Sequence, residues 1–266
     1  RDLVGTVVSA GPGAPGFRAG DRVWCSSLGY AGRQGAAAEQ AVVPVDRLYH
    51  LPDNVAPDVA VATVHPAATA HLALFRHGRA RAGETVLVTG AAGNVGSALV
   101  TLAVAAGARV IATAAARDAA YCRGLGAAEV FDYRDPDLAG LVRDAAPHGV
   151  DVHLDTSGRN DLATAVDLLA PRGRIVLLAG VRSRPVLPAG RLYLKDGSVT
   201  GFALSNATTA ELAEAAVTVN RLLAAGRLRP RATETLPLSA TADVHRRMER
   251  GELHGRRVVL RPALDG

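Results

Sequence analysis

The chain has 266 residues, of which 48% are apolar and 21% charged, and this composition excludes a disordered chain. Its two cysteines, Cys25 and Cys122, are far apart in the sequence, which excludes a disulfide framework and a cysteine-based zinc site and favours a reducing, cytoplasmic location. The net charge of +5 comes almost entirely from arginine, because Lys195 is the only lysine.

The first third of the chain predicts strands followed by helices. Residues 3–48 contain valine-rich runs cut by glycine and proline turns, which indicates short strands of a small β-barrel. Residues 53–76 are rich in alanine, valine and leucine, with Pro57 and Pro66 as breaks, so we expect two helices there.

From residue 85 onward the pattern alternates strictly between strand and helix. Strands are expected at residues 85–89, 109–113, 129–132, 150–155 and 174–178, and helices at 95–106, 117–125, 136–145 and 162–169. Gly107, Gly126 and Gly173 each follow a predicted helix, where a left-handed residue would end it. Such alternation predicts a parallel sheet covered by helices on both faces.

The last third predicts a strand at 198–202, a helix from the capping residue Thr208 to Gly226, a strand at 231–236 and a helix at 239–250. A final apolar strand at 256–260 is expected to return to the opening barrel. The uncharged run 85–108 is long enough to span a bilayer, but Gly90, Gly93 and Gly96 lie in its middle, so we expect no membrane helix.

Residues 86–96, VLVTGAAGNVG, form a strand, a glycine-rich turn and a helix start, in the order that a dinucleotide site requires. Backbone N–H groups and the helix N-terminus would bind the pyrophosphate. Gly93 would allow close approach of the phosphates, and Gly96 would let the helix pack on the sheet.

The end of the second strand favours NADP over NAD. A cofactor with a free ribose 2′-hydroxyl usually meets an acid there, but residues 114–116 are all alanine. Arg117 could pair with a 2′-phosphate, although Asp118 lies beside it and a solvated helix start is an equal alternative. Tyr133, after the third strand, is the other candidate near the adenosine.

Several motifs together resemble one family. They are GDRV at 20–23, AE at 38–39 before VVP at 42–44, TA at 69–70, the glycine turn at 90–96, GF at 201–202 and GRRVVL at 255–260. With them the chain resembles the zinc-independent quinone oxidoreductases (ζ-crystallin-like) of the medium-chain dehydrogenase/reductase superfamily.

The resemblance implies an α/β protein in which a Rossmann doubly wound parallel sheet interrupts a GroES-like β-barrel domain. The Rossmann NADP-binding domain would be formed by residues 69–203, and the catalytic domain by residues 1–68 and 204–266. Relatives carry a longer segment before the position of Leu3, so we expect the barrel to be partial.

The resemblance also places Thr69, Gly180, Phe202 and Leu204 around the nicotinamide. The full set of predicted cofactor-binding residues is Thr69, Ala92, Gly93, Asn94, Val95, Gly96, Thr113, Arg117, Tyr133, Gly180, Phe202 and Leu204. Arg1 stands where zinc-dependent relatives carry a ligand histidine, so no metal is expected. No catalytic acid is assigned: His71, where relatives often have tyrosine, could touch the substrate or be an ordinary helix residue.

The implied function is the NADPH-dependent transfer of hydride to a quinone or another conjugated carbonyl compound. An enoyl thioester reductase of the same superfamily is an alternative, since it shares the fold and the cofactor. A further alternative is an NADPH-binding interaction protein that contacts RNA through the six arginines of residues 246–261, although a solvated surface is the simpler interpretation. The resemblance also implies a homodimer in which the strand at 198–202 pairs with its copy.

Overall fold

The computed structural model describes residues 1–262, and the chain divides into two compact units. One unit combines Arg1–Ala68 with the residues from Leu204 onward, and the other is Thr69–Ala203. The first unit is therefore discontinuous in sequence, and the second is inserted into it.

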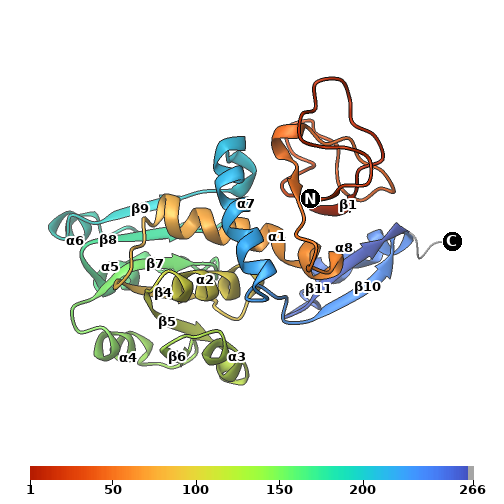
Figure 1. The fold of residues 1–266 in the computed structure, drawn as a ribbon. Helices are drawn as coiled ribbons and strands as arrows, with labels where there is room; N and C mark the ends of the chain where they lie inside the picture. Colours follow the sequence, from red (N-terminus) through yellow and green to blue (C-terminus); the bar gives the residue numbers. More distant parts are fainter. Residues whose placement is uncertain (263–266) are drawn as a thin grey trace. The chain divides into compact units, whose positions relative to one another are not determined.

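The inserted unit contains a six-stranded parallel sheet with the strand order β6-β5-β4-β7-β8-β9 (Figure 1). Its strands are β4 (Thr85–Thr89), β5 (Arg109–Ala114), β6 (Glu129–Asp132), β7 (Val150–Asp155), β8 (Leu169–Leu177) and β9 (Ser198–Gly201). The order reverses between β4 and β7, as in the doubly wound sheet of a Rossmann fold. The predicted parallel sheet is thus confirmed.

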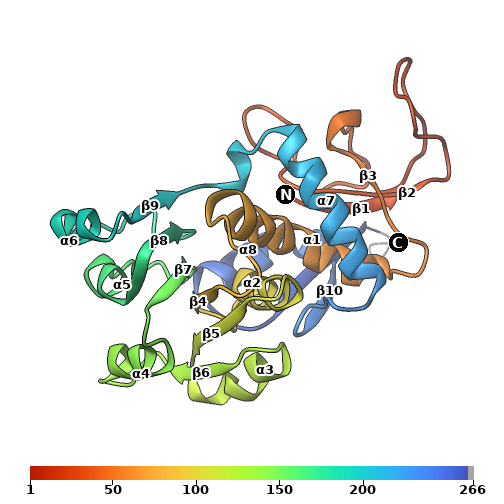
Figure 2. The same cartoon turned by 60° about the vertical axis from the view of Figure 1, so that its left-hand side comes forward.

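Helices cover both faces of this sheet (Figure 2). Helices α2 (Asn94–Ala105) and α3 (Ala119–Gly124) lie on one face, and α4 (Leu138–Ala145) and α5 (Leu162–Leu168) on the other. On the second face Leu87, Ile111 and Ile175 are buried against apolar residues of α4 and α5. Burial on both faces explains the nearly continuous aliphatic runs of β4 and of the second half of β8.

The structure corrects the prediction that Gly173 ends a helix. Gly107 and Gly126 have the positive φ expected after a helix, but Gly173 lies inside β8, which begins directly after α5. A Cβ on Gly173 would lie 2.9 Å from the Ala170 carbonyl oxygen, so close packing requires this glycine. A short helix, α6 (Ala189–Leu194), precedes β9 and was not predicted from the sequence. Lys195 follows this helix, and its Nζ donates to the carbonyls of Asp167 and Leu169.

The expected helix break at Pro66 was also wrong. Helix α1 (Pro57–His71) runs through Pro66 and continues as a π-helical segment, Leu72–His77. Proline has no N–H to donate to the carbonyl four residues earlier, which here is that of Ala62. Nε of Arg257 donates to this carbonyl at 3.1 Å, so a side chain from the end of the chain replaces the missing helix bond.

The discontinuous unit contains two small sheets. Strands β1 (Leu3–Thr6), β2 (Arg22–Cys25) and β3 (Tyr49–His50) form an antiparallel sheet, and β10 (Thr233–Pro237) pairs in parallel with β11 (Arg257–Arg261). The last strand was expected to return to the opening sheet, but in the structure β11 pairs with β10 alone, in a separate sheet. Helix α7 (Thr209–Ala224) begins with the predicted cap: Thr208 and Glu211 form a capping box.

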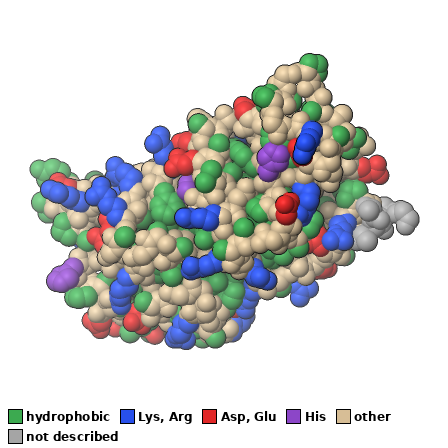
Figure 3. Space-filling model, in the orientation of Figure 1, with side chains coloured by type: hydrophobic (Ala, Val, Ile, Leu, Met, Phe, Trp, Pro, Cys, Tyr) green, Lys and Arg blue, Asp and Glu red, His purple; other side chains and the backbone are tan. Residues whose placement is uncertain are grey.

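The arginines near the end of the chain are paired with acids. Each of the six arginines between 246 and 261 forms an ion pair: Arg246 with Asp243, Arg247 and Arg256 with Glu234, Arg250 with Glu252, Arg257 with Asp2, and Arg261 with Asp58. On the face shown in Figure 3, basic side chains are interspersed with acidic and neutral ones. Across residues 1–262 no helix has both the length and the apolar character needed to cross a bilayer.

Glu234 gives the stability of this unit a dependence on pH. On β10 it accepts two hydrogen bonds from Arg247 of α8 (Thr241–Glu249), at 2.9 and 2.8 Å, and one from Arg256 at 3.4 Å. These hydrogen bonds, those of Arg247 above all, lower the pKa of Glu234 from 4.5 to about 2.

A carboxylate whose pKa is lower in the folded state stabilises the fold above its unfolded pKa. We therefore expect this contribution to be complete above about pH 5 and to be lost as the pH falls towards 2. The Glu234→Gln variant should unfold more easily than the parent at pH 7 and as easily near pH 2. Urea denaturation at the two pH values measures the difference, and an equal loss at both would contradict the assignment.

Candidate functional site

The carboxyl ends of β4, β5, β7 and β8 meet at one edge of the parallel sheet. Strands β4 and β7 are neighbours in the sheet, and the strand order runs in opposite directions on either side of them. In doubly wound sheets, ligands bind beyond the carboxyl ends of the strands at such a switch point. The glycine turn follows β4 directly and lies at this point.

The turn is held in shape by close backbone contacts. Gly90 has a φ of +78°, the Gly93 N–H donates to the Gly90 carbonyl at 3.0 Å, and the Ala91 N–H donates to that of Thr113 at 3.0 Å. A Cβ on Gly96 would lie 2.2 Å from the Gly90 oxygen and 2.8 Å from the Ala91 Cα, so helix α2 can pack this close only with glycine.

Gly93 is the N-cap residue of α2, and no side chain of residues 1–262 caps this helix. The N–H groups of its first turn are therefore not satisfied by a cap, in contrast to those of α7. An uncapped helix N-terminus beside a glycine turn is suited to bind an anionic group such as a pyrophosphate.

Basic side chains lie in the loops that follow the carboxyl ends of β5 and β6. The Arg117 guanidinium is 68% exposed and lies 4.0 Å from the buried Asp118 carboxylate. The Tyr133 ring has the Arg134 guanidinium 4.8 Å and the Arg159 guanidinium 5.6 Å from its centroid. Arg117 and Tyr133 were predicted from the sequence, whereas Arg134 and Arg159 were not.

The Asp132 carboxylate, at the end of β6, accepts the N–H groups of Ala116 and Arg134 at 3.2 and 3.0 Å. This acid is thus engaged by the backbone of the two turns. The exposed side chains beside it are the aromatic Tyr133, the basic Arg134 and the acidic Asp135. Of these, the basic and aromatic groups suit an adenosine that carries an additional phosphate.

Buried polar side chains line the sheet beneath this edge. The Thr113 Oγ1 is buried without a hydrogen-bond partner among residues 1–262, and Thr89 Oγ1 lies 2.7 Å from Nε2 of His153. Burial lowers the pKa of His153, against the opposing effect of Asp155, so the imidazole is neutral at pH 7. Thr156, also missed from sequence, donates from Oγ1 to the Thr89 and Gly90 carbonyls at 2.7 and 3.2 Å.

The residues expected around a nicotinamide fall in both units. Gly180 follows β8 with a φ of +92°, and the Phe202 ring, after β9, stacks on His77 with centroids 4.3 Å apart. Thr69 lies in α1, and Leu204 begins a 3-10 helix of the discontinuous unit. His71, also in α1, is 5% exposed with its ring edge-on to Phe75, a packing that favours an ordinary helix residue.

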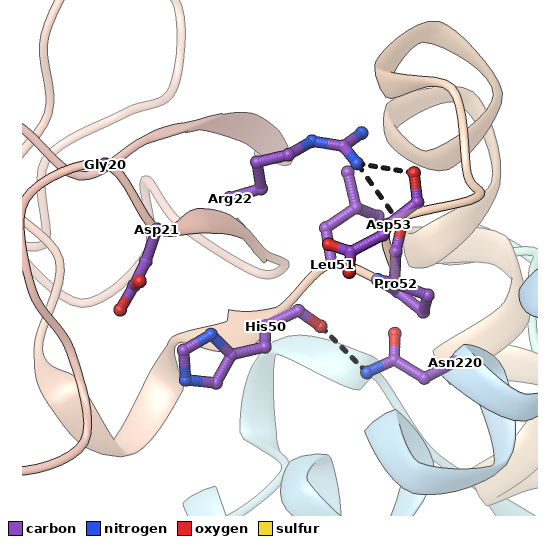
Figure 4. Close-up of a pocket in the computed structure, with 8 residues that line it drawn as sticks. All are labelled: Gly20, Asp21, Arg22, His50, Leu51, Pro52, Asp53 and Asn220. Carbon is purple, nitrogen blue, oxygen red and sulfur yellow. Dashed lines mark hydrogen bonds between the residues drawn. The ribbon is translucent and has the colours of Figure 1, made fainter.

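A separate open pocket of about 510 Å³ lies in the discontinuous unit (Figure 4). Its polar groups are engaged in structural hydrogen bonds. Asn220 donates to the His50 carbonyl and accepts from the Trp24 indole, and Arg22 donates to the Asp53 carbonyl. We therefore assign this pocket no chemistry.

The described residues do not fit a zinc ion. Among residues 1–262, no three His, Cys, Asp or Glu side chains lie close enough together to bind a metal. Cys25 and Cys122 are buried free thiols, and burial raises the pKa of Cys25 to about 12, which makes it a packing residue rather than a thiolate ligand.

The order of the sheet and the glycine turn define a Rossmann-type domain, and comparison with known proteins agrees. Residues 94–219 match the family described as zinc-binding dehydrogenase, and residues 1–53 match the alcohol dehydrogenase GroES-like domain. The quinone oxidoreductase of Mus musculus is 32% identical over 248 residues, which cover 92% of this chain and 73% of that protein.

Two solved structures are also similar. A quinone oxidoreductase of Pseudomonas syringae pv. Tomato DC3000 is 29% identical with a TM-score of 0.83, covering 98% of this chain and 81% of that one. A mycobacterial protein solved in complex with NADPH is 28% identical with a TM-score of 0.82, with the same coverage of 98% and 81%. The chain therefore belongs to the quinone oxidoreductase-like family of the medium-chain dehydrogenase/reductase superfamily.

The Gly96 contact predicts that alanine will change the stability of the protein very differently at two helical glycines, Gly96 and Gly124. Gly96→Ala should destabilise the protein by about 2–3 kcal/mol, because the added methyl group would overlap the Gly90 carbonyl. Gly124→Ala, in α3, is the matched control: no atom lies within 4 Å of its new Cβ, so the change should be neutral or stabilise by about 0.5–1 kcal/mol. Thermal unfolding of the two variants tests this, and equal effects would show that the contact is relaxed in solution.

Proposed function

We propose that this protein is an NADPH-dependent oxidoreductase that transfers hydride to a quinone or another conjugated carbonyl compound, without zinc. The observation that carries the proposal is the glycine turn at the N-terminus of uncapped α2, at the switch point of the sheet. Support also comes from the family to which the chain belongs and from the relative that was solved with NADPH.

In this proposal the predicted residues have three roles. Residues 92–96 bind the pyrophosphate, Thr113, Arg117 and Tyr133 bind the adenosine end, and Thr69, Gly180, Phe202 and Leu204 surround the nicotinamide. Bound NADPH supplies the hydride from C4 of its nicotinamide ring. The protein contributes by binding the cofactor, orienting that ring towards the acceptor and excluding water.

The acceptor is tested by comparing two substrate classes. NADPH oxidation by the same preparation should be measured with a quinone and with an enoyl thioester, at equal concentrations. A kcat/KM that is higher for the quinone supports the proposal. A higher value for the thioester would assign the protein to the enoyl reductases.

We expect NADPH to bind more tightly than NADH, because residues 114–116 offer no acid to a ribose and the next residue, Arg117, is basic and exposed. Arg117→Glu should weaken NADPH binding roughly ten- to a hundredfold, since one charge-assisted pair with phosphate is replaced by repulsion. NADH binding should change little. Arg123→Glu, on the exposed side of α3, is the control for net charge, and fluorescence titration of both cofactors gives the affinities.

We also propose a homodimer formed through the β9 edge. Strand β9 is the last strand of the sheet, and Tyr193 and Leu194 of the preceding helix α6 are 79% and 80% exposed. Pairing of β9 with its copy would remove an unpaired edge and cover these apolar side chains. Light scattering measures the mass, and a mass of 27.4 kDa at every concentration would contradict the dimer.

The RNA-binding alternative is not retained, because the arginines that suggested it are paired with acids. A cytoplasmic location stays part of the proposal, since buried free thiols such as Cys25 and Cys122 suit a reducing compartment.

A further inference from the structure

Two turns at the carboxyl edge of the sheet pack backbone against backbone. Gly158 follows β7, Gly180 follows β8, and their φ angles are +75° and +92°. A Cβ on Gly180 would lie 2.6 Å from the Gly158 carbonyl oxygen and 2.5 Å from Nδ2 of Asn160. No side chain at position 180 would fit between the turns without moving one of them.

The Asn160 side chain joins these turns. Its Nδ2 donates to the Ala179 carbonyl at 3.0 Å and to Oγ of Ser183 at 2.6 Å, and Ser183 Oγ donates onward to the Gly180 carbonyl at 2.7 Å. One amide group therefore fixes, directly or through Ser183, the peptide carbonyls on both sides of Gly180. Asn160 is 3% exposed, so water does not compete for these bonds.

Asn160 has two uncommon features, its backbone conformation and an unpaired side-chain oxygen. Its φ is +54°, in the left-handed region that few residues other than glycine adopt. Its Oδ1 is buried and has no hydrogen-bond partner in the part of the chain that the structure describes. Asparagine adopts this backbone region more readily than most residues, so the cost in stability comes from the unpaired buried acceptor. Such costs concentrate at functional sites.

The segment that carries Asn160 also touches the glycine turn. Thr156, four residues earlier, donates to the Thr89 and Gly90 carbonyls. The loop after β7 thus contacts the turn proposed to bind the pyrophosphate at one end and the Gly180 turn at the other. It fixes the spacing between the two.

We propose that Asn160 is a positioning residue that holds the Gly180 turn in the shape that receives the nicotinamide. The inference rests on the proposed function, because it takes Gly180 as a neighbour of that ring. Asn160 acts through the Ala179 and Gly180 peptides and does not itself touch the cofactor. Without it the turn samples other shapes, and the nicotinamide loses its fixed orientation while the rest of the cofactor stays bound.

The test compares two ligands that differ only in the nicotinamide: NADPH and 2′-phospho-ADP-ribose. Asn160→Gly keeps the left-handed backbone accessible and removes both hydrogen bonds. Its Kd for NADPH should rise about tenfold, which corresponds to a turn that holds the receiving shape about a tenth of the time. Its Kd for 2′-phospho-ADP-ribose should stay within about twofold. The kcat for quinone reduction should fall as well, because the ring is no longer aligned.

Two further variants complete the experiment. Ser183→Ala removes only the hydrogen bond that connects Asn160 to the Gly180 carbonyl. It should raise the Kd for NADPH about threefold and leave the Kd for 2′-phospho-ADP-ribose unchanged. This variant keeps the test valid if Asn160→Gly does not fold. Asn54→Gly is the matched control, since Nδ2 of Asn54 also donates to a carbonyl, that of Ala224 at 2.9 Å, in the discontinuous unit. It should change neither affinity.

Selective loss of NADPH affinity supports the inference. If the affinities for both ligands fall equally, Asn160 is a merely structural residue. If neither affinity changes, Asn160 has no part in positioning the nicotinamide. Either result overturns the proposal. Failure of the proposed function has a different signature, because the unaltered chain would then bind neither ligand.

Discussion

The approach of helix α2 to the glycine turn is the contact on which the inserted unit depends. With Gly96 directly against the Gly90 carbonyl, helix α2 starts just after β4 ends, so its N-terminus lies at the switch point of the sheet. Any side chain at position 96 would push the helix away and separate its N-terminus from the edge of the sheet. One missing methyl group therefore sets both the packing of the sheet and the geometry of the candidate site.

The elements of the inserted unit could be predicted because each strand and helix carries its own local signal. Aliphatic runs mark β4 and β5, an apolar residue at every second position marks β7, and glycines with positive φ mark the ends of α2 and α3. Errors arose where a distant residue decides the local structure. Pro66 does not break α1, because Arg257 supplies the hydrogen bond that proline cannot make, and nothing near position 66 announces that partner.

The candidate site was predictable to the extent that it is a sequence motif. The glycine turn and the absence of an acid after β5 are visible along the chain. The contributions of Arg159 and Thr156 are not, because these side chains reach the turn or Tyr133 from the loop after β7, more than twenty residues away from either. Pattern alone does not tell which loops of a parallel sheet meet; that depends on strand order.

The near absence of lysine has a chemical consequence of its own. Apart from Lys195, every basic side chain is an arginine, and Lys195 donates its ammonium to two backbone carbonyls. Guanidinium groups stay protonated at every pH that the protein would meet, whereas acylating reagents and acetyltransferases act on ε-amines. The arginine charges of this protein are therefore not changed by pH or by acylation, and lysine acetylation has a single target, Lys195, whose ammonium is already hydrogen-bonded.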